Sequence, residues 1–313
     1  MERFVLIDGN AILHRAYHAL PTLTSRSGEL VNAVYGFTTM LFKVISDLKP
    51  KYLAVAFDTE KPTFRHQEYI GYQAQRPKMA EELAGQIEKV HQVLVAMGIP
   101  IFQREGFEAD DVIGTLANQV VKKKKKIEVL IVSGDRDITQ LIKGKIKVYV
   151  PLKGLSEAKI FDEKEVKEKI GVFPWQIPDF KGLVGDPSDN YPGVPGIGPK
   201  TAVELLKRFK TLEEIYQNLD KVSKFFPKGV VEKLIQGREL AVLSKKLATI
   251  VLDVPLKIDL ERCRFFFGEK EKERIIQKFR EFGFKSLISR ISGSEKDSSK
   301  SPTSKKEIQE KLF

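Results

Sequence analysis

The 313-residue sequence contains a single cysteine, Cys263, and only four histidines. One cysteine excludes a disulfide framework and any metal cage built from thiolates. The histidines are irregularly spaced, at His14, His18, His66 and His91, which argues against a histidine-based metal centre. No apolar run reaches the ~18 residues that a membrane span needs, and the N-terminal residues do not resemble a secretory signal. We therefore expect a cytoplasmic protein without a membrane partner, in which carboxylates must hold any metal.

The sequence carries an excess of positive charge. Lys and Arg number 53 against 42 Asp and Glu, which gives a formal net charge of +11. Such a surplus favours a polyanionic partner, nucleic acid first. The length suits two domains. Five consecutive lysines at 122–126 follow an expected helix, and they fit either a solvated helix end or a phosphate contact.

Three short apolar runs each end at an aspartate. They are residues 4–8, 52–58 and 129–135. Unbroken apolar runs indicate strands buried on both faces of a parallel sheet, and helical spacing between them predicts an α/β domain. A further short strand is expected at 99–102. Because the carboxyl ends of such strands line one crevice, Asp8, Asp58 and Asp135 should share one edge of the sheet.

Compact acidic groups occur at three further places. They are Glu108-Ala-Asp110-Asp111, Asp135-Arg-Asp137 and Asp186-Pro-Ser-Asp189. Taken singly, each group fits ordinary helix-cap or turn chemistry. Gathered in one crevice, ionised carboxylates repel each other unless cations neutralise them, and oxygen ligands select Mg²⁺ or Mn²⁺. So many carboxylates favour a two-metal site of the kind that hydrolyses phosphodiesters.

Glycine and proline become frequent after about residue 170, and helical patterns then continue to about residue 290. Within this stretch, Gly196 and Gly198 allow close backbone approach, Pro199 opens a helix, and Lys200 adds charge. This pattern predicts a phosphate-binding helix–hairpin–helix at about 183–209. Residues 291–313 are rich in serine and charge and are expected to form a disordered tail or linker.

Seven motifs, in this order, resemble the 5′-nuclease family that includes flap endonucleases. The most similar branch is the 5′→3′ exonuclease domain at the N-terminus of bacterial DNA polymerase I. The motifs are Asp8-Gly-Asn, Phe57-Asp58, Phe64-Arg65-His66, Glu108-Ala-Asp110-Asp111, Ser133-Gly-Asp135-Arg-Asp137, Gly185-Asp186-Pro-Ser-Asp189-Asn190 and Gly196-Ile-Gly198-Pro199-Lys200.

The resemblance implies a particular domain plan. A PIN/resolvase-like nuclease core, α/β with a mainly parallel sheet flanked by helices, is expected at 1–172. A helical arch is expected within it at about 62–82. A helical DNA-binding subdomain that contains the helix–hairpin–helix is expected at 173–290.

The resemblance also implies the site residues. Two Mg²⁺ ions are expected, with Mn²⁺ able to substitute, and K⁺ is expected at the hairpin. The resemblance assigns the first ion to Asp8, Asp58, Glu108, Asp110 and Asp111. It assigns the second ion to Asp135, Asp137, Asp186 and Asp189. Catalytic roles are implied for Asp8, Asp58, Asp135, Arg65 and Arg76. DNA contacts are implied for Arg15, Arg65, Tyr72, Arg76, Lys78, Gly196, Gly198 and Lys200.

Two positions depart from the family pattern. Gln73 stands where the family usually has a lysine that stabilises phosphate charge, and Lys78 is the candidate substitute. His14 stands where the family often has an aromatic residue. Neither departure affects a carboxylate.

The expected function is a structure-specific 5′→3′ exonuclease and 5′-flap endonuclease that acts on DNA and RNA primers in replication and repair. Its partner would be DNA with a 5′ flap, nick or primer end. We expect a monomer, either free-standing or joined to a DNA polymerase. Three alternatives stay open: a PIN-type ribonuclease, a non-catalytic junction-binding module, and a phospho-acceptor receiver domain. The ribonuclease and the receiver would leave the hairpin unexplained.

Overall fold

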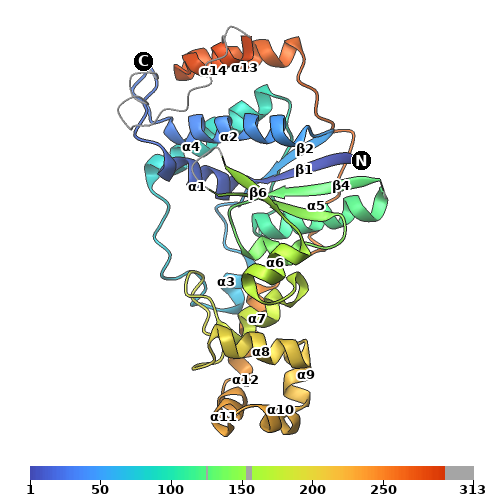
Figure 1. Ribbon diagram of the computed structural model, residues 1–313. Coiled ribbons are helices and arrows are strands. Elements are labelled where there is room, and N and C mark those ends of the chain that lie inside the picture. The colour runs from blue at the N-terminus through green and yellow to red at the C-terminus, as the bar shows by residue number, and fades with distance from the viewer. Residues whose placement is uncertain (125, 153–156, 293–313) are drawn as a thin grey trace.

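A computed structural model describes residues 1–124, 126–152 and 157–292 (Figure 1). Its central feature is one six-stranded sheet with the strand order β3-β2-β1-β4-β5-β6. Neighbouring strands are parallel except for the β5–β6 pair. The strands are β1 (Glu2–Asp8), β2 (Tyr52–Ala56), β3 (Ile101–Phe102), β4 (Ile127–Val132), β5 (Ile146–Pro151) and β6 (Ala158–Phe161). The predicted mainly parallel α/β fold is confirmed, with β5 and β6 as additions that the sequence patterns did not indicate.

Alternate residues of β1 face two separate layers of helices, as the pleat of a strand requires. Val5 and Ile7 are buried against α1, α2 and α4. Phe4 and Leu6 are buried against α5 on the other face. Figure 1 shows these two helical layers on opposite sides of the sheet. The helices are α1 (Gly9–Ala19), α2 (Asn32–Leu48), α4 (Glu81–Ala96) and α5 (Ala109–Lys123).

A separate group of helices continues from the α5 side of the sheet. They are α6 (Glu163–Ile170), α7 (Ile177–Val184), α8 (Pro199–Phe209), α9 (Leu212–Gln217), α10 (Leu219–Phe225), α11 (Lys228–Gln236) and α12 (Arg238–Ala248), with a short 3₁₀ helix, η2 (Pro174–Gln176). Leu205 and Leu206 of α8 belong to the same buried cluster as Val112 of α5. The helical part therefore shares a continuous core with the α/β part.

The predicted helix–hairpin–helix corresponds to α7, the connecting loop 185–198, and α8. The loop is braced internally, because Asp186 and Tyr191 exchange backbone hydrogen bonds. Its ends also meet, since a Cβ atom at Gly193 would lie 2.2 Å from the backbone nitrogen of Gly185. With φ at +61°, position 193 accepts only glycine without strain. The loop is a rigid connection between two helices.

The segment predicted as a helical arch is only partly helical. It contains one short helix, α3 (Phe64–Glu68), followed by turns up to the start of α4. Gln73 lies in the left-handed region with φ at +54°, and Pro77 follows. Both features are incompatible with a continuous helix.

The last described helices, α13 (Glu269–Phe282) and α14 (Lys285–Ser292), return to the α/β part, where Figure 1 shows them above α2 and α4. Phe279 is fully buried, and its ring contacts Phe42 of α2 at a centroid distance of 6.2 Å. Most of this pair had been expected within the helical subdomain at 173–290. Of the tail expected at 291–313, residues 293–313 lie outside the described residues. No helix in the described part of the chain has both the length and the apolar character that crossing a bilayer requires.

Replacing Phe279 with alanine should lower the free energy of unfolding by about 3–5 kcal/mol, because a fully buried aromatic ring is removed from a packed layer. Chemical denaturation measures this change. Phe266→Ala is the control, since Phe266 is 77% exposed and its loss should matter little. Equal effects of the two substitutions would contradict the packing of α13 on the core.

Candidate metal centre

The carboxylate of Asp8 connects two neighbouring strand ends. Asp8 is the last residue of β1 and the N-cap of α1, where its Oδ1 accepts the Ala11 N–H at 2.9 Å. Its Oδ2 accepts the Ser133 hydroxyl at 2.7 Å, just after β4. Asp8 is only 4% exposed. These bonds fix the orientation of the carboxylate at the carboxyl end of the sheet.

Asp58 joins β2 to the start of α5 in the same way. It follows β2 by two residues, and its Oδ1 accepts the Ala109 N–H at 2.7 Å. Its own N–H donates to the Asn10 side chain at 2.9 Å. Because Glu108 is the N-cap of α5 and Asp110 lies in its first turn, this bond brings their carboxyl groups to the Asp58 side of the edge.

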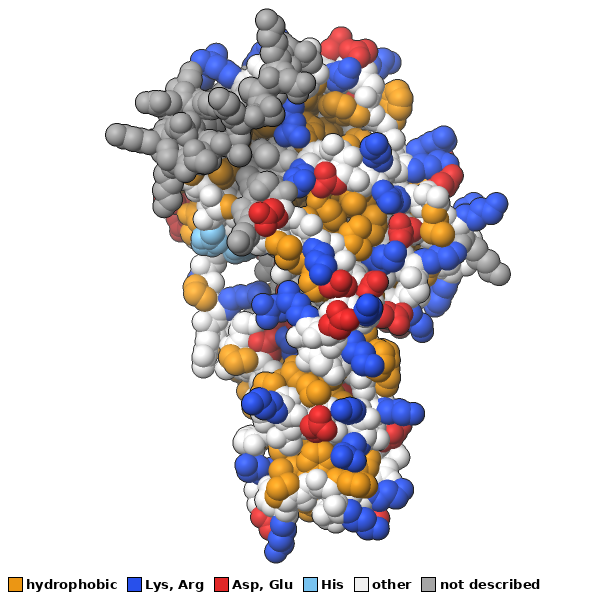
Figure 2. Space-filling model, viewed as in Figure 1, with side chains coloured by type: hydrophobic (Ala, Val, Ile, Leu, Met, Phe, Trp, Pro, Cys, Tyr) orange, Lys and Arg blue, Asp and Glu red, His pale blue; other side chains and the backbone are white. Residues whose placement is uncertain are grey.

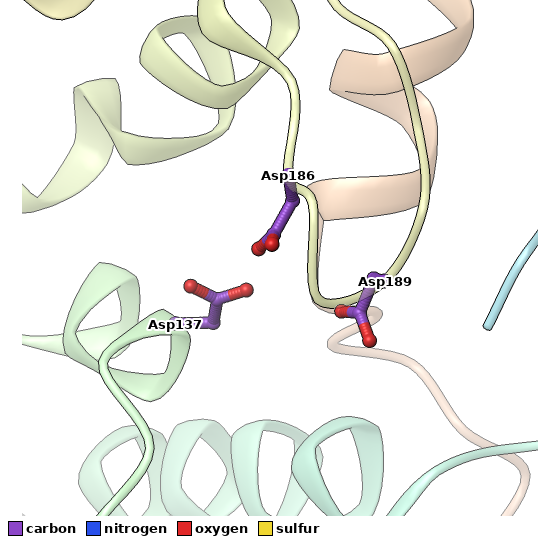
Figure 3. A group of neighbouring side chains, drawn as sticks. All are labelled: Asp137, Asp186 and Asp189. Atoms are coloured by element: carbon purple, nitrogen blue, oxygen red, sulfur yellow. The ribbon is translucent and has the colours of Figure 1, made fainter. Parts of the chain in front are cut away.

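A second acidic group combines two distant parts of the chain. Asp135 follows β4 and accepts the N–H of Asp137, which begins the 3₁₀ helix η1 (Asp137–Leu141). Asp186 and Asp189 come from the loop after α7. One carboxylate oxygen from each of Asp137, Asp186 and Asp189 lies within 4.8 Å of the others. Figure 3 shows the loop residues facing Asp137 across this gap.

Both acidic groups border a cleft of about 620 Å³. Its carboxylates are Asp8, Asp58, Glu108, Asp110, Asp135, Asp137 and Asp189. Its wall also contains the predicted DNA-contacting residues Tyr72, Arg76 and Lys78, together with His14 and Gln73. The structure therefore gathers most of the sequence-predicted acidic residues around one cavity. Asp186 stands behind Asp137 and Asp189, outside the lining.

Asp111 does not face this cavity. It is fully buried, and its two oxygens accept bidentate hydrogen bonds from Arg65 at 2.7 and 2.8 Å. The Glu108 and Val251 N–H groups also donate to it. Its carboxylate is thus occupied by protein donors, although the resemblance placed it in the first metal group.

Arg65 is equally enclosed, at 2% exposure. Besides Asp111, it donates to the carbonyls of Leu247 and Thr249, at the end of α12. The sequence analysis assigned Arg65 a catalytic and DNA-contacting role. In the structure Arg65 is a buried connection between α3, α5 and α12. It also lines the cleft and lies 3.4 Å from Glu108, and its catalytic and DNA-contacting roles stay predictions.

The segment after α3 is attached to the loop that carries the second acidic group. The Gln73 N–H donates to the Asp189 carbonyl at 2.9 Å, and the Gln73 amide donates to the Asp189 carboxylate at 3.0 Å. Asn190 donates to the Gly71 carbonyl at 2.7 Å. Arg76 approaches Asp189 at 3.8 Å. Gln73, which departs from the family pattern, is therefore a hydrogen-bond donor to Asp189.

Arg15 and Lys181 differ most from the sequence-based expectation. Arg15 was expected at DNA, yet its guanidinium donates to the Leu152 carbonyl at 2.8 Å. Lys181 was not singled out, yet its ammonium lies 2.5 Å from Asp137 and also pairs with Asp186. Lys181 lies in the last turn of α7, five residues before Asp186, and no motif in the sequence marks it.

The pKa values of the carboxyl groups reflect their burial and, after it, their neighbouring charges. Burial, followed by repulsion from neighbouring carboxylates, raises the pKa of Asp110 well above its usual range. Burial also raises the pKa values of Asp8 and Glu108 to about 7 and that of Asp137 to about 6. The exception is Asp186, where the Lys181 ammonium outweighs burial and lowers the pKa. Negative charge here is costly without a cation.

The donor set fits a hard divalent cation. The groups crowded together are carboxylate oxygens, which such ions prefer, and their raised pKa values show that the protein alone compensates them incompletely. The candidates for metal ligands are thus Asp8, Asp58, Glu108, Asp110, Asp135, Asp137, Asp186 and Asp189.

The fold and this acidic edge define a resolvase-like nuclease domain followed by a helical domain. Two family models match the chain in this arrangement. The "5′-3′ exonuclease, N-terminal resolvase-like domain" matches residues 3–171, and the "5′-3′ exonuclease, C-terminal SAM fold" matches residues 172–282. The chain belongs to the 5′-3′ exonuclease family.

Curated relatives and solved structures agree with this placement. DNA polymerase I of Caldicellulosiruptor bescii is 44% identical over 94% of this chain, and that of Bacillus subtilis is 41% identical over 93%. The chain spans about a third of these relatives' length, 34% and 32% respectively. The zinc-bound T5 5′-exonuclease has the same fold, with a TM-score of 0.64 at 18% identity, covering 94% of this chain and 98% of that one. The catalytic core of Rad2 in complex with DNA gives a TM-score of 0.59 at 15% identity, covering 93% and 90%.

Stabilisation by Mg²⁺ should increase with pH. Between about pH 4 and 7 the metal-free folded protein holds protons on Asp8 and Glu108 that the unfolded chain has released, so their contribution to stability is lost as the pH rises through 7. Metal ions compete with these protons. The Mg²⁺-induced rise in Tm should therefore be larger at pH 8 than at pH 5.5, measured by thermal unfolding against EDTA. An equal rise at both values would count against the carboxylates as ligands.

Replacing Arg65 with methionine should cost about 3–5 kcal/mol of stability, because it leaves Asp111 buried without its partner. Arg76→Met is the matched control, since its side chain is 56% exposed and its loss should change stability by less than about 0.5 kcal/mol. Denaturation curves give both values. A stable Arg65→Met protein that loses only activity would instead support the catalytic role.

Proposed function

We propose that this chain is a structure-specific 5′ nuclease that cleaves DNA at a 5′ flap, nick or primer end, with two divalent ions, Mg²⁺ or Mn²⁺. The observation that carries the proposal is the set of seven carboxylates that border one cleft beneath the segment 62–82. A cap or turn role would not require carboxylates from β1, β2, α5, η1 and the loop 185–198 to converge. Their convergence on one cleft supports a reaction centre that binds cations.

The body of the protein is suited to a polyanion although the cleft is acidic. The net charge is +11, and Figure 2 shows lysine and arginine side chains over both the α/β and the helical parts of the viewed face. Such a field attracts DNA independently of its sequence. Within the cleft wall, Arg76 and Lys78 provide positive charge toward which a 5′ strand can be drawn. His14 and Tyr72 offer rings for contact with a base.

The protein residues divide the work at the reaction centre. Asp8, Asp58, Glu108 and Asp110 form the first acidic group, and Asp135, Asp137, Asp186 and Asp189 form the second. Bound divalent ions would lower the pKa of a water and stabilise the charge of the leaving 3′ oxygen. The hydrogen bonds from Ala11, Ser133 and Ala109 keep the carboxylates of Asp8 and Asp58 in fixed orientations. The reaction centre is thereby organised before the substrate arrives.

The loop 185–198 and the start of α8 form the proposed duplex grip. Gly196 has φ at +81°, and Pro199 is the first residue of α8, whose terminal N–H groups suit a phosphate. Lys200 adds a charge, and K⁺ is the proposed monovalent ion at this hairpin. Contacts of this kind grip the backbone without reading the bases. The protein would act as a monomer on DNA, either free-standing or joined to a DNA polymerase; its similarity to DNA polymerase I supports a polymerase as its partner.

Asp135→Asn should reduce flap cleavage by at least about 10–100-fold, the range for removing a group that supports a metal site. Asp135 is exposed, so its loss should leave the fold intact. The assay uses 5′-end-labelled flap DNA with Mg²⁺ or EDTA, and a binding measurement on the same DNA.

Asp253→Asn is the control, because Asp253 is also exposed but lies outside the cleft lining. Cleavage at the junction that needs Mg²⁺ and is lost only in Asp135→Asn supports the nuclease. Tight flap binding without cleavage in Mg²⁺ or Mn²⁺ would favour the junction-binding module. Cleavage of RNA alone would favour the ribonuclease.

A further inference from the structure

We propose that Lys181 is an internal cation of the second acidic group: its ammonium holds Asp137 and Asp186 together in the metal-free protein and must leave them when a divalent ion binds there. The inference rests on the proposed function, since it concerns the same carboxylates. It assigns Lys181 a positioning and competing role that no motif in the sequence indicated.

The contacts of Lys181 place its charge at the centre of this group. Its ammonium lies 2.5 and 2.7 Å from the two oxygens of Asp137 and pairs with Oδ2 of Asp186. The side chain is 17% exposed and reaches the carboxylates from the last turn of α7. Lys181 thus binds both oxygens of Asp137 and Oδ2 of Asp186, the two side chains that face each other in Figure 3.

Two other oxygens of the group are already held by other donors. Oδ1 of Asp186 accepts the Ser188 N–H at 2.8 Å and the Ser188 hydroxyl at 2.7 Å. Oδ1 of Asp189 accepts the Gln73 amide and faces Arg76. An ion that binds Asp137 and Asp186 must therefore use the oxygens that Lys181 occupies.

Size and charge make the two occupants exclusive. A hard divalent ion binds oxygen at about 2.0–2.2 Å, which is closer than an ammonium approaches. An ion between Asp137 and Asp186 would therefore stand where the ammonium stands, and the two positive charges would repel each other. Lys181 can withdraw, because four flexible methylene groups connect its charge to the end of a helix.

Exclusion of this kind predicts two unequal metal affinities. In the first acidic group, the donors to Asp8 and Asp58 in the described part of the chain are N–H and hydroxyl groups, so an ion can bind there without displacing an ammonium. The second group should bind an ion only after the ammonium has left. Removing the lysine charge should therefore strengthen the weaker binding step alone.

The test is Mn²⁺ binding to the full chain without DNA, followed by electron paramagnetic resonance of free Mn²⁺ and by calorimetry. Wild type should show a tight and a weak step. Lys181→Met should tighten the weak step by about tenfold or more, as expected when a neighbouring positive charge is removed. Lys181→Arg, which keeps the charge, should leave that step weak and guards against an effect of misfolding.

Lys245→Met is the matched control, because Lys245 is another partly buried lysine whose ammonium pairs with Asp179 at 2.6 Å, away from the cleft lining. It should leave both Mn²⁺ steps unchanged. A second reading is thermal unfolding: Lys181→Met should have a lower Tm than wild type in EDTA, and excess Mn²⁺ should close the difference.

The outcomes separate this inference from the proposed function. Two Mn²⁺ steps with the same affinities in wild type and Lys181→Met would overturn the role of Lys181 while leaving the two-ion nuclease intact. Equal tightening in Lys245→Met would overturn it also. Absence of Mn²⁺ binding in every variant would overturn both the inference and the two-ion function.

Discussion

Electrostatic repulsion among carboxylates at one edge of a parallel sheet is the constraint around which this protein is built. The ends of β1, β2 and β4 each bring an acid to the same place, and burial, with repulsion between the carboxylates, raises the pKa values of Asp8, Asp110 and Glu108. The fold withstands this cost because donors fix the carboxylates one by one: a hydroxyl and N–H groups on the first group, an amide and an ammonium on the second. The negative charge that these donors leave uncompensated can bind a divalent ion.

The buried Arg65–Asp111 pair supports this arrangement from the border of the cleft, where Arg65 also lies 3.4 Å from Glu108. It joins the short helix α3 to α5 and to the end of α12, so it connects both domains beside the cleft. A pair of this kind contributes little net stability when complete but is costly to break. The pair therefore determines how α3, α5 and α12 are arranged more than it adds to the stability of the fold. An arginine next to a catalytic edge is not necessarily in contact with the substrate.

The sequence predicted the α/β fold, the strand-end aspartates and the hairpin because each depends on local patterns. Asp8, Asp58 and Asp135 follow apolar runs, and the edge rule alone places them together. The contacts of Arg65 and Lys181 could not be predicted in this way. Arg65 reaches a carbonyl 182 positions away, and Lys181 reaches an aspartate 44 positions away. Such pairs depend on how α7 and α12 dock, which composition and spacing do not encode. Strand β5 is not followed by an aspartate, and β6 is antiparallel and ends before Asp162, which caps α6.

The braced loop 185–198 fixes the spacing between two parts of the molecule. One end carries Asp186 and Asp189, and the other carries Gly196 and Gly198, so the second acidic group and the proposed duplex grip belong to one braced piece of backbone. A DNA held by its backbone at the hairpin would then present the same phosphate to the carboxylates whatever its bases. The fixed spacing between hairpin and carboxylates would set the position of the cut along the DNA duplex. The DNA ends left by such a cut would meet without gap or overlap.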